Sequence, residues 1–200
     1  PDDDIERLTA QEQQQRVTAL RQQIETVLSS AQKGKMIRDG LRVVIAGKPN
    51  VGKSSLLNAL LGQERAIVTD IPGTTRDVIE EYINLNGIPL KIVDTAGIRE
   101  TDNLVEQIGV DKAQQFMKNA DLVLYVIDAV QGITEQDTDM LSQIQDRPVI
   151  YLVNKSDMGI DDNIRQQLAS MLDKKTVLEI SAQQKTGLEA LEKSITDLFF

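Results

Sequence analysis

The chain has 200 residues, of which 40% are hydrophobic and 26% are charged, a composition that predicts one main globular domain with a substantial core and an appended segment. It contains no cysteine and no histidine, which excludes disulfides, thiolate metal sites, cysteine nucleophiles and imidazole acid–base catalysis within these residues. The net charge of -9 argues against a broad nucleic-acid-binding face, because contacts to phosphates need clustered lysine and arginine.

The longest apolar runs, such as residues 122–127, are much shorter than a membrane span, and no positively charged leader precedes an apolar core. We therefore expect a cytoplasmic protein with no membrane partner.

Residues 2–33 are rich in glutamine and charge, and their apolar residues recur at spacings of three, four and seven. This spacing predicts an amphipathic helix, whose apolar stripe consists of Leu8, Val17, Leu20, Ile24, Val27, Leu28 and Ala31. Gly34 and Gly40 bracket a short basic joint, and we expect both to act as helix-stop signals. The helix is expected to pack on its own domain or on further sequence. A partner-recruiting coiled coil is the alternative, which the short, irregular stripe disfavours.

From residue 41 onward, short β-branched runs alternate with patterns of helical spacing. The expected elements are strands at 41–47, 78–85, 86–94, 122–128, 149–154 and 176–180, and helices at 54–62, 135–145, 162–172 and 187–199. This order predicts an α/β fold with a mostly parallel sheet of about six strands and helices on both faces. A hairpin that turns at Asn86 and Gly87 supplies one antiparallel strand. Ligands of such sheets bind at the carboxyl ends of the strands.

The first of these strand ends carries the sequence GKPNVGKS at residues 47–54, which matches G-x-x-x-x-G-K-[ST]. Glycines let backbone N–H groups surround phosphates, and the following helix adds positive potential at its N-terminus. Lys53 is expected to reach the β and γ oxygens, and Ser54 to ligate Mg²⁺. The predicted binding residues of this loop are Asn50, Val51, Gly52, Lys53, Ser54 and Ser55. A chance match in a glycine-rich turn is disfavoured by the flanking strand and helix.

The sequence DTAG at residues 94–97 ends the third predicted strand. Asp94 is expected to bind Mg²⁺ through water, and the N–H of Gly97 to sense the γ-phosphate. Thr95 and Ala96, between these two residues, are also predicted to bind the nucleotide. The alternative, an ordinary turn, is disfavoured by the position of the motif after a buried strand.

A third strand end carries Asn154, Lys155 and Asp157 in the sequence NKSD. The carboxylate of Asp157 can accept hydrogen bonds from guanine N1–H and N2–H₂, a donor pair that adenine lacks. We expect Asn154 to brace the loop and the purine edge, and the stem of Lys155 to cover the base. Read alone, NKSD is also a common polar turn. The pair Ser181 and Ala182 after the last strand is weaker evidence, and could present a backbone N–H to guanine O6.

A long segment without periodicity, RAIVTDIPGTTRDVIEEY at residues 65–82, separates the first helix from the hairpin. Segments of this length and position are often functional. Thr75 is predicted to supply the second hydroxyl ligand of Mg²⁺. This contact would order the segment only in the triphosphate state. A plain solvated loop is the alternative.

Taken together, GKPNVGKS, DIPGTTRD, DTAG, NKSD and SA resemble the translation-factor-related GTPases and, more closely, the G domain of the MnmE (TrmE) family of tRNA-modification GTPases. The resemblance covers residues 41–200. It implies a Ras-like P-loop GTPase fold, with residues 40–200 as the GTP-binding G domain and residues 1–39 as part of an α-helical domain. Ribosome-assembly GTPases of the Der (EngA) type share PNVGKSSLLNALLG and DTAGIR. The sequence RETDNLVEQIGVDKA at residues 99–113 and the helical segment favour the MnmE type.

The resemblance also implies how hydrolysis is catalysed, because Ile98 stands where many GTPases carry a water-orienting glutamine. In the family a glutamate farther along performs this role, and the matching residue here is Glu106. The implied catalytic residues are Glu106, Lys53 and Thr74. The implied K⁺ ligands are Asn50, Thr69, Ile71 and Thr74, and a cation there would stabilise charge that an arginine finger otherwise meets. Without the resemblance, Glu106 is better explained as a solvated acid near a helix N-terminus.

The motifs lead to an expected function, Mg²⁺-dependent hydrolysis of GTP to GDP and phosphate. The resemblance implies that this hydrolysis is activated by K⁺ and by homodimerisation of G domains through their switches. The resemblance implies that the full-length protein works with the flavoprotein MnmG on the wobble uridine of tRNA. The alternatives are a ribosome-assembly GTPase of the Der type and a non-catalytic module that senses GTP and GDP. ATP use is a more remote alternative.

Overall fold

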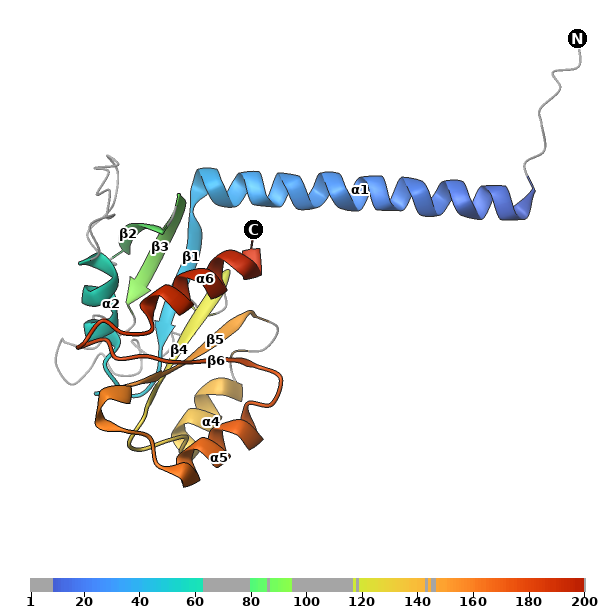
Figure 1. The fold of residues 1–200 in the computed structure, drawn as a ribbon. Helices are drawn as coiled ribbons and strands as arrows, with labels where there is room; N and C mark the ends of the chain where they lie inside the picture. Colours follow the sequence, from blue (N-terminus) through green and yellow to red (C-terminus); the bar gives the residue numbers. More distant parts are fainter. Residues whose placement is uncertain are drawn as a thin grey trace, which may run out of the picture.

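One six-stranded sheet forms the centre of the protein, in the order β2-β3-β1-β4-β5-β6 (Figure 1). The computed structural model describes residues 9–62, 80–85, 87–94, 117, 119–142, 144 and 147–199. The strands are β1 (Leu41–Ala46), β2 (Glu80–Leu85), β3 (Ile88–Asp94), β4 (Leu122–Asp128), β5 (Val149–Asn154) and β6 (Thr176–Glu179). Neighbouring strands are parallel except β2 and β3, which are antiparallel. The predicted sheet, including its single antiparallel strand, is confirmed.

Helices cover both faces of the sheet, as predicted (Figure 1). Helices α2 (Lys53–Leu61) and α6 (Leu188–Phe199) share one hydrophobic cluster with the sheet. Helices α4 (Glu135–Ser142) and α5 (Asp162–Met171) contribute to a second cluster. A short 3-10 helix, η1 (Ser156–Met158), follows β5. The carboxyl ends of the parallel strands are thus held between two packed layers.

Alternation along β1 explains why both layers form. Val43 and Ile45 lie in the cluster with α2 and α6, whereas Val44 lies in the other cluster. Successive side chains of a strand point to opposite faces, so a continuous apolar run is buried on both sides. All seven residues of β4 are buried. Each large aliphatic side chain removed from water contributes about 1.5–3 kcal/mol, which fixes the strands that carry the loops described below.

The N-terminal helix α1 (Ala10–Asp39) continues past residue 33, where the predicted helical segment ended. It begins with a capping box, in which Thr9 and Glu12 bond each other's backbone N–H groups, and it ends at Gly40, whose N–H donates to the carbonyl of Met36. The predicted stop at Gly34 is wrong, because the helix continues through this residue. One interior glycine costs only about 1 kcal/mol, and the residues around it are good helix formers. Gly40 is the stop that the structure confirms.

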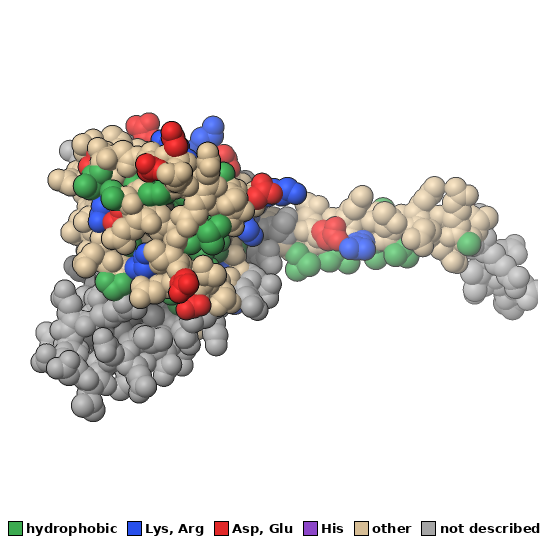
Figure 2. Space-filling view, turned by 90° about the horizontal axis from the view of Figure 1, so that it is seen from below, with side chains coloured by type: hydrophobic (Ala, Val, Ile, Leu, Met, Phe, Trp, Pro, Cys, Tyr) green, Lys and Arg blue, Asp and Glu red, His purple; other side chains and the backbone are tan. Residues whose placement is uncertain are grey.

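Helix α1 extends away from the sheet, and a row of apolar side chains runs along it (Figures 1 and 2). The stripe members Val17, Leu20, Ile24, Val27 and Leu28 are between 51% and 65% exposed. Leu8 lies outside the described residues. Near the other end of the helix, the partly buried Met36 packs against the core. The predicted stripe therefore exists, but the described part of the domain leaves these five residues exposed.

None of the helices in the described ranges combines the length and apolar character needed to cross a membrane.

Candidate functional site

The phosphate-loop sequence connects the end of β1 to the start of α2. Gly52, the residue before α2, has φ +98°, and a Cβ atom there would overlap the side-chain amide of Asn154. Asn50 also has a positive φ, 63°. Only glycine combines this backbone conformation with so close an approach at low cost. The phosphate loop therefore lies in close contact with the NKSD segment.

The first turn of α2 faces this loop without a side-chain cap, because its N-cap residue is Gly52. The first N–H groups of an α-helix have no partner within the helix and carry positive potential, so they favour an anion. Ser54 and Ser55, both exposed, lie in the same turn. The structure thus places the predicted phosphate contacts at one helix end.

Lys53 is 7% exposed, although it is the lysine expected to reach the phosphates. Its Nζ donates a 2.6 Å hydrogen bond to the carbonyl oxygen of Lys48, five residues earlier in the same loop. The ammonium is thus held beside the loop rather than extended into solvent. A buried lysine on a glycine-rich loop is poised to stabilise negative charge on bound phosphates.

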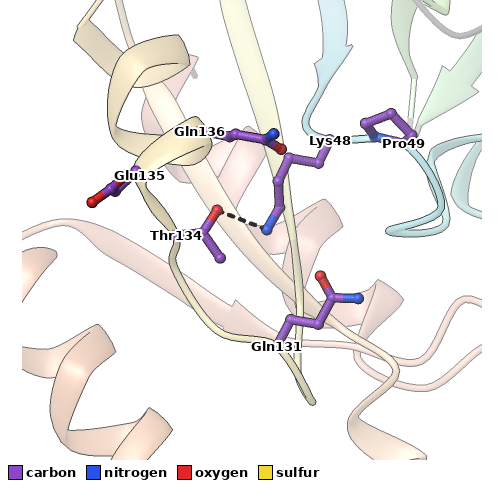
Figure 3. Close-up of a pocket in the computed structure, with 6 residues that line it drawn as sticks. All are labelled: Lys48, Pro49, Gln131, Thr134, Glu135 and Gln136. Carbon is purple, nitrogen blue, oxygen red and sulfur yellow. Dashed lines mark hydrogen bonds between the residues drawn. The ribbon is translucent and has the colours of Figure 1, made fainter.

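Behind the loop, the side chain of Lys48 points toward Thr134 (Figure 3). Lys48 belongs to a polar cluster with the buried residues Asp137 and Tyr125, which sequence reasoning missed. Its Nζ lies 2.9 Å from Asp137 Oδ2 and 3.0 Å from Thr134 Oγ1. Asp137 accepts further hydrogen bonds from the hydroxyl of Tyr125 and from the N–H and hydroxyl of Thr134. Lys48 stands at an unspecified position of the motif, and Asp137 is far away in the sequence. No pattern in the sequence therefore connected them.

The charge state of this cluster follows from its hydrogen bonds. Burial alone would raise the pKa of Asp137, but donation from Lys48, Thr134 and Tyr125 outweighs burial and lowers the pKa. Burial, together with the neighbouring carboxylate, raises the pKa of Tyr125. At neutral pH the cluster therefore contains an ionised aspartate and a neutral tyrosine.

Asn154 joins the phosphate loop to the loop after β6. Its Nδ2 donates a 2.8 Å hydrogen bond to the carbonyl of Val51, and its Oδ1 accepts a 3.0 Å hydrogen bond from the N–H of Ala182. The residue is 2% exposed. A second link, from the N–H of Ser156 to the carbonyl of Ile180, holds the NKSD loop beside the same loop. Three predicted nucleotide loops are thus brought together by the protein's own hydrogen bonds.

Lys155 has a left-handed conformation, with φ 67°, and reaches back toward the phosphate loop. Its Nζ lies 2.9 Å from the carbonyl oxygen of Asn50 and 2.6 Å from Asp128 Oδ2. Burial would raise the pKa of Asp128, but hydrogen bonds from Lys155 and from the N–H of Val130 lower it. The ion pair therefore fixes the direction of the lysine stem, which the sequence predicted to cover the base.

Asp157 lies in η1 and is exposed, so its carboxylate is accessible to a ligand. The expected contact of Ser181 or Ala182 with guanine O6 meets a competing arrangement. The N–H of Ser181 donates to the carbonyl of Thr186, and that of Ala182 donates to Asn154. A contact from Ala182 to a base would require this N–H to be shared or redirected.

Of the predicted Mg²⁺ ligands, the described residues include Ser54 and the backbone of Asp94. Asp94 is the last residue of β3 and pairs with Ile45 near the end of β1, and the loop after β1 leads to Ser54. The two residues therefore arise from adjacent strand ends, and oxygen ligands suit Mg²⁺. The remaining predicted residues of the switch segments lie outside the described residues; they are Thr69, Ile71, Thr74, Thr75, Thr95, Ala96, Gly97 and Glu106.

Comparison with known sequences connects this arrangement to GTPases. The sequence model of the family described as 50S ribosome-binding GTPase matches residues 42–155. A tRNA modification GTPase MnmE from Clostridioides difficile is 46% identical over 200 residues, which are 100% of this chain and 43% of that protein. The MnmE of Geobacillus kaustophilus is 49% identical over 99% of this chain and 43% of that protein. The chain thus spans less than half the length of these curated relatives.

Solved structures with the same fold include two of Era. Era from Aquifex aeolicus bound to GDP.AlF4- has a TM-score of 0.64 and 32% identity, over 80% of this chain and 56% of that chain. Era in complex with MgGDPNP and nucleotides 1506-1542 of 16S ribosomal RNA has a TM-score of 0.63 and 32% identity, over 78% of this chain and 55% of that chain. The Ras-like fold and the resemblance inferred from the motifs are confirmed.

Proposed function

Because the chain belongs to the GTPase family described as 50S ribosome-binding GTPase, we propose that residues 40–200 form a G domain that hydrolyses GTP to GDP and phosphate with the help of Mg²⁺. One observation carries the proposal: Asn154 bonds the phosphate loop through Val51 and the last nucleotide loop through Ala182. Loops joined in this way are held in place before a ligand binds, and preorganisation lowers the cost of binding.

Phosphate binding rests on the loop and the first turn of α2. The N–H groups of that turn and the ammonium of Lys53 would meet the β and γ oxygens. Ser54, Thr75 and, through water, Asp94 would hold Mg²⁺, which neutralises phosphate charge when bound. Era, which shares this fold, has been solved with MgGDPNP, and this supports the proposal that Mg²⁺ accompanies the triphosphate.

Base recognition rests on the NKSD loop. Asp157 is exposed in η1 and would accept hydrogen bonds from guanine N1–H and N2–H₂. The stem of Lys155, directed by Asp128 and by the carbonyl of Asn50, would cover one face of the base. Adenine lacks the N1–H and N2–H₂ donor pair, so an aspartate left without these donors penalises the wrong nucleotide.

Hydrolysis is proposed to use Glu106 to orient the attacking water, with Lys53 and Thr74 stabilising the transferred phosphoryl group. A potassium ion held by Asn50 and by carbonyl oxygens of the first switch, at Thr69, Ile71 and Thr74, would supply the positive charge that other GTPases obtain from an arginine finger. This part of the proposal is supported by the resemblance, and by the exposed position of Asn50 within the phosphate loop.

We place this activity in a larger protein that modifies tRNA. The relatives that match the whole chain carry the name tRNA modification GTPase MnmE. We propose that residues 1–39 belong to an α-helical domain of such a protein, that its G domains pair through their switches, and that it acts in the cytoplasm with MnmG on wobble uridine. The exposed stripe of α1 supports a helical domain that continues beyond this helix.

A ribosome-associated GTPase is the second candidate, because the matching family carries that description and Era has been solved with 16S ribosomal RNA nucleotides. The two candidates differ in their RNA partner. Full-length protein that restores the wobble modification in a strain lacking it supports the first candidate. Restoration of ribosome assembly without a change in tRNA supports the second.

The test of the hydrolytic proposal is steady-state GTP turnover by the full-length protein in KCl and in NaCl at equal ionic strength. Faster turnover in KCl is expected, whereas equal rates contradict the K⁺ site. Glu106→Ala should abolish turnover and leave GTP affinity nearly unchanged. Unchanged turnover would make Glu106 a solvated acid, and no turnover by the unmutated protein in either salt would support the nucleotide-sensing module.

A further inference from the structure

The buried cluster behind the phosphate loop has no part in the function proposed so far. Lys48 is 6% exposed and Asp137 is 0% exposed, and their charged atoms lie 2.9 Å apart. Burying two charges is costly, and a buried ion pair can often be replaced by apolar residues without loss of stability. Stability alone therefore gives a poor account of this pair.

Asp137 is a fixed point, because it is held from three parts of the fold. Tyr125 on β4 donates to one carboxylate oxygen at 3.0 Å. Thr134, the residue before α4, donates to the other oxygen from both its N–H and its hydroxyl, at 2.9 and 2.8 Å. A carboxylate with all these partners has little rotational freedom. The ammonium of Lys48 is thus anchored to the sheet and to the start of α4.

Lys48 also holds Lys53, through its own backbone carbonyl. The carbonyl oxygen of Lys48 accepts the 2.6 Å hydrogen bond from Lys53 Nζ. Lys48 is therefore fixed at its side chain by Asp137, while its carbonyl fixes the direction of the lysine that faces the phosphates. A small displacement of that carbonyl would move the ammonium of Lys53, and misplacement by about 1 Å can cost about 100-fold in rate.

We propose that Lys48 is a positioning residue, whose ion pair with Asp137 orients the backbone carbonyl that directs Lys53 toward the β- and γ-phosphates. The inference rests on the proposed function, since it needs Lys53 to contact the nucleotide. Such a role accounts for the burial of the Lys48–Asp137 ion pair despite its cost, because the pair connects the phosphate loop to α4 and β4 at a defined distance.

The test compares variants that remove the pair without leaving one buried charge alone. Lys48→Met combined with Asp137→Asn approximately keeps the size of both side chains. The amide oxygen of the asparagine can still accept from the N–H and hydroxyl of Thr134, while its N–H₂ group donates to the hydroxyl oxygen of Tyr125 instead of accepting from it. The matched control is Arg165→Gln with Glu179→Gln, which removes an exposed ion pair between α5 and β6. Each pair of changes is made in the full-length protein, with and without Lys53→Ala, and affinity for a fluorescent, non-hydrolysable GTP analogue is measured.

If Lys48 acts through Lys53, removing the pair lowers affinity by about tenfold when Lys53 is present and by less than about twofold when it is alanine, because coupled residues are not additive. Equal losses in both backgrounds, or no loss in either, overturn the proposal. The control pair is expected to have no effect in either background. Failure of the unmutated protein to bind the analogue would instead reject the proposed function.

Turnover supplies a second measurement that does not depend on the Lys53→Ala background. Loss of the pair should lower kcat by a larger factor than it raises KM, since Lys53 meets more charge in the transition state. A pocket of about 610 Å³, lined in part by Lys48, Gln131 and Thr134, leaves room for a larger cation (Figure 3). Lys48→Arg should therefore keep kcat within about threefold of the value for the unmutated protein.

Lys48→Gln combined with Asp137→Asn is the alternative arm if the first double variant does not fold, because the glutamine amide can still donate to Thr134 and neither residue is left as a lone buried charge. An unchanged kcat in a folded variant that lacks the pair overturns the proposal, as does a kcat for Lys48→Arg as low as that of the double variant.

Discussion

The side-chain amide of Asn154 donates to the carbonyl oxygen of Val51, 103 residues earlier in the chain, at a distance of 2.8 Å. The carbonyl of the same amide accepts the N–H of Ala182. Both polar groups of one buried side chain are thus used to hold two loops, and among the described side chains no buried polar atom lacks a partner. The nucleotide loops are consequently joined in the protein alone.

Asn154→Ala should weaken GTP binding by about tenfold or more, because it leaves the Val51 carbonyl and the Ala182 N–H without a partner, at about 1–3 kcal/mol for each group. The measurement is fluorescence titration with a labelled nucleotide. Asn163→Ala, at an exposed position on α5, is the control and should bind normally. Equal affinities of the two variants would mean that the loops hold their positions without Asn154.

Asp157→Asn should reduce GTP affinity by about 10–100-fold, since hydrogen bonds to a charged group contribute about 1.5–3 kcal/mol. The amide now offers a donor, so xanthine nucleotides, which carry an oxygen at position 2, should bind better than they bind the unmutated protein. Competition titrations with GTP and XTP test both effects. Asp162→Asn, exposed in the first turn of α5, is the control. An unchanged preference between GTP and XTP would mean that Asp157 does not contact the base.

Gly52→Ala should impair nucleotide binding and stability together. The residue has φ +98°, and a Cβ atom would overlap the amide of Asn154, whereas Gly87 has φ +91° with nothing within 4 Å of such an atom. A side chain at positive φ costs about 1–2 kcal/mol at either position. Gly87→Ala is therefore the matched control. Gly52→Ala should lose more unfolding free energy and more GTP affinity than Gly87→Ala, and the difference measures the effect of the overlap with Asn154. Equal losses in the two variants would contradict this prediction.

Sequence patterns predicted the sheet because its strands are buried on both faces. Val43, Val44 and Ile45 each enter a core layer, and such runs leave little freedom in the choice of element. The strand-end motifs could then be placed, since strand ends of a parallel sheet meet at one edge. The loops of Asn50 to Ser55 and of Asn154 to Asp157 were predictable for that reason.

Two features could not be predicted from local pattern. Gly34 was expected to stop α1, but its penalty of about 1 kcal/mol is small beside the cooperativity of a helix that runs from Ala10 to Asp39. Lys48 and Asp137 form a pair that depends on the packing of α4 against β4. Such a partner is fixed by tertiary structure, and neither residue type is unusual where it stands.

The apolar stripe of α1 should contribute little to the stability of the 200-residue chain. Ile24 is 51% exposed, whereas Leu56 in α2 is fully buried. Ile24→Gln should change the free energy of unfolding by no more than about 0.5 kcal/mol, and Leu56→Ala should reduce it by about 2–5 kcal/mol. Urea denaturation followed by circular dichroism measures both. A large loss at Ile24 would mean that the stripe is covered in solution.

The cluster around Asp137 should make the protein sensitive to acid. The pKa of Asp137 is lowered in the folded state, because donation from Lys48, Thr134 and Tyr125 outweighs burial. In the unfolded chain an aspartate titrates near about 3.9. Between these two values the unfolded chain binds more protons, so stability rises with pH there. The contribution of Asp137 is therefore complete above about pH 5 and is lost as pH falls through about 4 toward the folded pKa.

Asp137→Asn removes the titrating group and keeps its shape. The variant should be less stable than the unmutated protein at pH 7, and the difference should shrink as pH falls from about 5 to about 3. Urea unfolding at several pH values in this window measures the free energy of each protein. The unmutated protein should show the steeper fall, because it alone must protonate a carboxylate that Lys48 holds ionised. Parallel curves would mean that Asp137 does not contribute to acid unfolding.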